Sequence, residues 1–80
     1  MNQLSKLHWR CRRGMREMDL LLGGFLEHYY PTASIELQQS FTALLDEIDQ
    51  DILDWIMQRQ APPAHYIDII EHLRNQQSQH

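Results

Sequence analysis

Apolar side chains recur every three or four positions along almost the whole of this 80-residue chain. That spacing collects them on one face of an α-helix, whereas a strand needs alternation with a period of two, which no stretch sustains. The pattern predicts an all-α fold, a compact bundle of five short helices. Their stripes run through Leu4, Leu7, His8 and Cys11; Met15, Met18, Leu22, Phe25, Leu26 and Tyr29; Leu37, Phe41, Leu44, Leu45 and Ile48; Ile52, Trp55 and Ile56; and Tyr66, Ile69, Ile70 and Leu73.

Glycine, proline and capping residues divide the chain at the same places. Gly14 supplies the left-handed conformation that would end the first helix near Arg13, and Pro31 would stop the second. Glu17 then falls in the first turn of the second helix, where an anion is favourable. The other boundary residues are Ser34 and Asp49, as helix caps, and Pro62 and Pro63, before a last helix that opens near Ala64.

A chain of this length forms one domain with a small core. Isolated helices shorter than ~12 to 15 residues rarely persist in water, so the five must be held by mutual packing. We expect residues 1–80 to form a single helical domain with a frayed tail over residues 75–80. The bulky residues expected in the core or at its rim are Trp9, Phe25, Phe41, Trp55 and Tyr66.

Charge is distributed unevenly along the chain. Residues 1–16 carry five cations and no acid, whereas residues 17–80 carry two arginines and eleven acids, for a net charge of −4. The acidic remainder would repel nucleic acid, so we expect no nucleic-acid partner. No apolar run approaches the ~20 residues that cross a bilayer, the N-terminus lacks the apolar region of a secretory signal, and a single cysteine suits a reducing compartment. These features predict a cytoplasmic protein without a transmembrane segment.

Two groups of residues have the composition of a chemical site. His8 and Cys11 are three apart, but two ligands do not close a zinc site, and a lone cysteine on an apolar face is usually a core residue. The acidic run from Asp46 to Asp54 lacks the glycine of an EF-hand loop and is interpreted as a solvated face with helix caps. We therefore expect no metal site, no catalytic residues and no enzyme.

The stretch RRGMRE, residues 12–17, is the strongest candidate for a functional site. Cations near the end of one helix and an anion near the start of the next are explained by the helix dipoles alone. Four arginines within seven residues exceed that need, and arginine beside glycine is typical of a protein contact surface. The residues alone leave both interpretations open.

The string HWRCRRGMREMD, followed by LLLGGFLEHYY and FTALLDEIDQDILDWIM, resembles the SdhE family of flavinylation factors. The resemblance covers roughly residues 6–60. The family signature RGxxE is matched by Arg13, Gly14 and Glu17, and a DxDxxxW-like stretch by Asp49 and Trp55 with the intervening Asp51. The region after Ala61 matches little.

The resemblance implies a five-helix assembly factor that binds the flavoprotein subunit of succinate dehydrogenase, and of fumarate reductase, and promotes covalent attachment of FAD to it. The histidine that receives the flavin belongs to the client, so this chain needs no stably bound cofactor, and it is expected to act as a monomer. The alternative is a small protein-interaction or antitoxin-like module with an unrelated partner. The client-binding role carries over to Arg13, Gly14 and Glu17, and more loosely to Arg12, Arg16 and Asp19.

Overall fold

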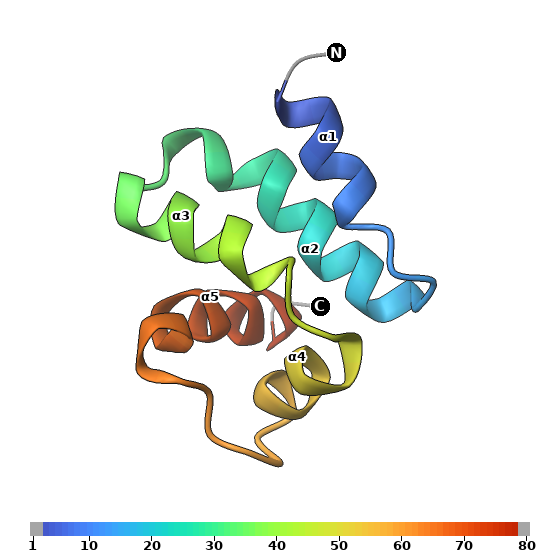
Figure 1. Cartoon of the computed structure of the whole chain (residues 1–80), viewed down its shortest axis with the longest axis vertical. Helices are drawn as coiled ribbons and strands as arrows, with labels where there is room; N and C mark the ends of the chain where they lie inside the picture. Colours follow the sequence, from blue (N-terminus) through green and yellow to red (C-terminus); the bar gives the residue numbers. More distant parts are fainter. Residues whose placement is uncertain (1–2, 79–80) are drawn as a thin grey trace.

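The computed structural model describes residues 3–78, and within that range the chain forms five α-helices, two short 3-10 turns and no strand (Figure 1). The predicted all-α bundle of five short helices is therefore confirmed. The elements are α1 Gln3–Arg10, α2 Arg16–His28, η1 Tyr30–Thr32, α3 Ile35–Leu44, α4 Asp49–Ile56, η2 Ala64–Tyr66 and α5 Ile67–Ser78.

The helix α5 lies at the centre of the packing and contacts α2, α3 and α4. Figure 1 shows α2 and α3 running side by side in opposite directions, joined by the turn at η1, while α1 lies against α2 at the edge of the bundle. Phe25 of α2 and Phe41 of α3 meet with ring centroids 4.8 Å apart, and both are fully buried. The apolar stripes thus converge on one core, as helices this short require.

The predicted helix boundaries hold in part. Ser34 caps α3, because its side-chain oxygen accepts a 3.1 Å hydrogen bond from the backbone N–H of Leu37. Asp49 was wrongly predicted to cap α4: it is the first residue of that helix, and its carboxylate accepts from Arg13 instead. The helix α1 ends at Arg10, earlier than the predicted Arg13, and Arg13 lies in the loop beyond it, where its side chain donates to the carbonyl of Leu45 after α3.

Two further expectations differ from the structure. The helix α5 continues to Ser78, so residues 75–78 are helical, and Gln76 Nε2 donates a 3.0 Å hydrogen bond to the carbonyl of Leu21; residues 79–80 lie outside the described part of the chain. Trp9 is 67% exposed and belongs neither to the core nor to its margin, whereas the other bulky residues named above are buried. No helix between residues 3 and 78 is long and apolar enough to span a membrane.

Candidate functional site at the junction of α1 and α2

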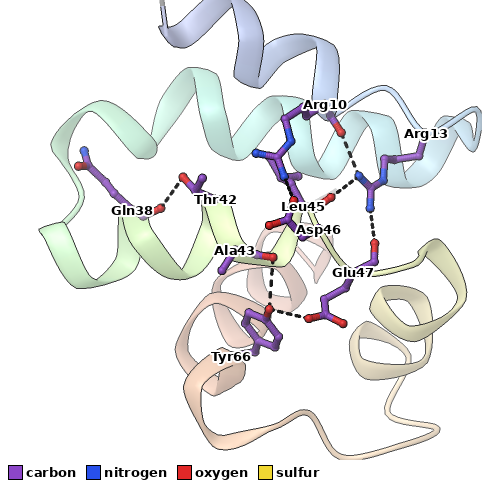
Figure 2. A network of polar contacts seen from close by, with 9 residues as sticks. All are labelled: Arg10, Arg13, Gln38, Thr42, Ala43, Leu45, Asp46, Glu47 and Tyr66. Atoms are coloured by element: carbon purple, nitrogen blue, oxygen red, sulfur yellow. Dashed lines mark hydrogen bonds and ion pairs between the residues drawn. The ribbon is translucent and has the colours of Figure 1, made fainter.

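The side chain of Arg13 points into the protein and joins the loop after α1 to the turn between α3 and α4. Its Nε donates to Asp49 Oδ1 at 2.8 Å, Nη1 to the carbonyls of Leu45 at 2.8 Å and Arg10 at 3.2 Å, and Nη2 to the carbonyl of Glu47 at 2.6 Å. Figure 2 shows the guanidinium among these carbonyls, and only 13% of the side chain remains exposed. Every guanidinium nitrogen of Arg13 thus has a protein partner.

The loop is also closed through its backbone. The N–H of Arg13 donates a 2.6 Å hydrogen bond to Asp19 Oδ1, from the beginning of α2. Gly14 follows with φ at +82°, a left-handed conformation that other residues adopt only with strain. The positive φ predicted for Gly14 is confirmed, although it lies in the connecting loop and not at the end of a helix. Arg13 and Asp19 together fix the path of this loop.

A second ion pair runs beside the first. Arg10 pairs with Asp46 (Figure 2). Since Arg13 pairs with Asp49, two arginines three residues apart meet two aspartates three residues apart. The interpretation of the acidic run as a solvated face with caps was therefore incomplete, because two of its carboxylates neutralise part of the cationic N-terminal segment. Arg10 thus joins the end of α1 to the turn after α3, and Arg13 joins the loop after α1 to the first residue of α4.

The remaining candidate residues face solvent. Arg12, Gly14, Arg16 and Glu17 are all exposed, and within residues 3–78 no hydrogen bond or ion pair engages the side chain of Arg16 or Glu17. The Arg12 guanidinium stands 5.7 Å from the centre of the Trp9 ring, a cation–π contact. The structure therefore divides the six predicted residues into two that hold the loop and four that it presents. We call these four, Arg12, Gly14, Arg16 and Glu17, the docking corner.

An open groove of about 860 Å³ begins at the docking corner and continues between α1 and α2. Trp9 and Leu20, exposed by 67% and 64%, are its large apolar residues, and Gly23 lies along it. Leu20 and Gly23 were not predicted from the sequence as surface features. The available signal was that Leu20 falls outside the apolar stripe of its helix.

Cys11 also borders this groove but is itself buried, with 2% of its surface exposed. Burial raises the pKa of its thiol to about 11, which keeps it protonated and makes it a poor nucleophile or metal ligand. Across residues 3–78 no three His, Cys, Asp or Glu side chains gather closely enough to hold a metal ion.

Tyr66 braces the same turn from the side opposite Arg13. Its hydroxyl lies 2.8 Å from Glu47 Oε2 and 3.2 Å from the carbonyl of Ala43, as donor to these acceptors (Figure 2). Burial, with the hydrogen bond to the Glu47 carboxylate, raises the pKa of Tyr66 to about 12. Glu47 is thus bound at its carboxylate by Tyr66 of η2 and at its carbonyl by Arg13.

The described residues thus form a small five-helix bundle in which exposed Arg12 and Gly14 line an open groove. The chain belongs to the Sdh5 family, described as "Flavinator of succinate dehydrogenase", and the match covers residues 5–77. The family predicted from the sequence is thereby confirmed.

The chain is similar to proteins named FAD assembly factor SdhE from three bacteria. It is 41% identical to that of Pectobacterium atrosepticum over 58 residues, which cover 72% of this chain and 66% of the relative, just under two thirds of its length. It is 37% identical to that of a Serratia species over 70 residues, covering 82% and 80%. With that of Pseudomonas aeruginosa the identity is 45% over 60 residues, covering 75% and 71%.

Proposed function

We propose that this chain binds the flavoprotein subunit of succinate dehydrogenase, and that of fumarate reductase where one is present, and promotes covalent attachment of FAD to it. It acts as an assembly factor in the cytoplasm, as a monomer and not as an enzyme. The FAD and the histidine that receives it both belong to the client. Membership of the flavinator family supports the client's identity.

The observation that carries the proposal is that the RGxxE motif has a held half, the arginine bonded within the protein, and a presented half, the glycine and glutamate exposed to solvent. Arg13 is bonded to four protein oxygens, while Gly14 and Glu17 beside it are exposed on a loop that those bonds keep in place. A loop already fixed in its bound shape loses little conformational entropy when a partner binds. The motif therefore presents a preformed contact, and Glu17 is free to touch the client directly.

Electrostatics favours a client surface that carries carboxylates. Lys6, Arg12 and Arg16 are exposed and make no ion pair within the described residues 3–78, whereas Arg10 and Arg13 are already paired. Exposed charges of one sign raise the rate of encounter with a surface of the opposite sign. Once docked, the chain raises the covalent yield by favouring a client geometry in which the histidine and the flavin can react.

The test is expression of the flavoprotein subunit with and without this chain, in a host that lacks its own copy. Covalent flavin is read by in-gel fluorescence of the denatured subunit. We expect strong fluorescence only when the chain is present and recovery of the two proteins together in a pull-down. Equal fluorescence with and without the chain contradicts the proposal, and recovery of an unrelated protein with no flavoprotein subunit favours the alternative interaction module.

A further inference from the structure

We propose that the groove between α1 and α2 receives one bulky apolar side chain of the flavoprotein subunit, from a segment that carries carboxylates beside it. This rests on the proposed function, and it adds the chemistry of the partner segment. The groove is lined from α1 by Trp9 and from α2 by Leu20 and Gly23, and it opens at Gly14 of the docking corner.

The groove owes part of its width to a glycine, Gly23, which has no side chain to fill it. A Cβ added at Gly23 meets no atom within 4 Å, although this glycine lies in the middle of α2. Glycine weakens a helix interior by about 0.5 to 1 kcal/mol relative to alanine, so a helix gains nothing from it locally. At this position it leaves space on the helix surface that a partner side chain can occupy.

The apolar side chains that line the groove are large and exposed, as in protein-binding sites. Trp9 and Leu20 are 67% and 64% exposed, on different helices, yet they line one groove. Single exposed apolar residues are ordinary, but two that share a concave surface mark a contact site. Tryptophan and arginine are enriched among the residues that dominate binding energy, and here Arg12 lies against the Trp9 ring.

The charges around the groove indicate which residues flank the client's apolar side chain. The residues that line the groove include one arginine, Arg12, and one acid, Asp19. The Asp19 carboxylate already accepts a hydrogen bond from the backbone N–H of Arg13. Exposed Lys6 and Arg16 lie close in sequence to the lining residues and add positive charge. A segment that pairs an aromatic or large aliphatic side chain with neighbouring carboxylates satisfies both features, whereas a basic segment is repelled.

The sharpest test fills the groove without removing any contact of the free protein. Binding of purified variants to the purified, FAD-loaded flavoprotein subunit is measured by calorimetry. We expect Gly23→Phe to weaken binding at least about tenfold, since its ring takes the place of the client's side chain, while Gly23→Ala stays within about twofold of the wild type. If Gly23→Phe binds as tightly as the wild type, the groove is not used and the proposal is overturned.

Truncations provide an independent measurement that does not depend on how Gly23→Phe folds. Trp9→Ala and Leu20→Ala should each weaken binding by about tenfold or more, because both lose apolar area that the client buries. Ile35→Ala is the matched control, since Ile35 is 69% exposed at the start of α3 and does not line the groove. Equal losses at Ile35 and at the two groove residues, or no loss at any of them, overturn the proposal.

The carboxylate component has its own readout, the dependence of affinity on salt. Arg12→Gln should flatten that dependence, while Arg59→Gln, at an exposed arginine outside this groove, should leave it unchanged. An unaltered salt dependence in Arg12→Gln removes the acidic neighbours from the proposal. If wild-type protein neither binds the subunit nor raises covalent flavin, the proposed function itself fails; if it does both while the groove variants match it, only this inference fails.

Discussion

Arg13 Nε donates a 2.8 Å hydrogen bond to Asp49 Oδ1, which joins the loop after α1 to the first residue of α4 across 36 positions of sequence. The same guanidinium donates to the carbonyls of Leu45 and Glu47. Exposed ion pairs contribute little to stability, but a largely buried arginine that satisfies several acceptors is costly to remove. The arginine of the RGxxE motif is thus a residue of the fold as well as of the site.

Replacing this arginine should destabilise the bundle. We expect Arg13→Ala to lower the free energy of unfolding by about 2 to 4 kcal/mol, because a carboxylate and three partly buried carbonyls lose their donor. Arg13→Lys should recover part of the loss, since an ammonium keeps the charge but cannot reach all the acceptors. Urea denaturation followed by circular dichroism measures both. Arg59→Ala is the control, because Arg59 is 55% exposed and 3.4 Å from Asp54, and its loss should stay below about 1 kcal/mol.

The stability cost of replacing Gly14 should depend only on how much strain the new residue has at a positive φ. Its φ is +82°, while an added Cβ meets no atom within 4 Å, so no steric clash contributes. Gly14→Ala should cost about 1 to 2 kcal/mol in unfolding free energy, and Gly14→Asn less, because asparagine enters the left-handed region more readily. Equal losses for Ala and Asn in urea denaturation would show that something other than φ sets the cost.

Tyr66 should make the bundle sensitive to alkali. Its hydroxyl is protonated in the fold up to a pKa of about 12, compared with 10.0 for an unperturbed tyrosine. The unfolded chain therefore loses this proton first, and the contribution of Tyr66 is complete below pH 10.0 and declines as the pH rises towards 12. Tyr66→Phe should be less stable than the wild type near neutral pH, and the difference should shrink across that window. A difference independent of pH contradicts the assignment.

Cys11 should resist modification while the protein is folded. The thiol is 2% exposed and its pKa is raised to about 11 by burial, so little thiolate is available. We expect iodoacetamide at about pH 8 to label the unfolded chain in urea many times faster than the native protein. Mass spectrometry gives both rates, and comparable labelling of the native protein would mean that Cys11 is accessible.

Much of the fold follows from local sequence signals. The apolar stripes specify five helices, and Ser34 and Gly14 behave as their chemistry requires, because caps and positive φ depend on near neighbours. The error at Asp49 has the opposite cause. Aspartate before a helix is an ordinary cap, and only the arrival of Arg13 from a distant part of the chain redirects its carboxylate.

The candidate site was predictable as a location but not as an arrangement. The sequence indicates the cluster of arginines beside Gly14, yet it does not distinguish Arg13, which is 13% exposed, from its exposed neighbour Arg12. That distinction is set by tertiary contacts with the turn after α3. The groove was not predicted for a related reason: Leu20 and Gly23 line a groove only because α1 packs against α2.

Glu17→Ala gives the most direct test of the claim that the presented half of the motif contacts the client. Its carboxylate is exposed and has no hydrogen bond or ion pair within residues 3–78, so the unfolding free energy should fall by no more than about 1 kcal/mol, the part due to the helix dipole. The measurement is covalent flavin formed on the purified flavoprotein subunit, with Glu27→Ala, exposed near the far end of α2, as the matched control. We expect Glu17→Ala to lose most of the promotion and Glu27→Ala to keep it; a stable Glu17→Ala protein that promotes flavin attachment as well as the wild type would contradict the account.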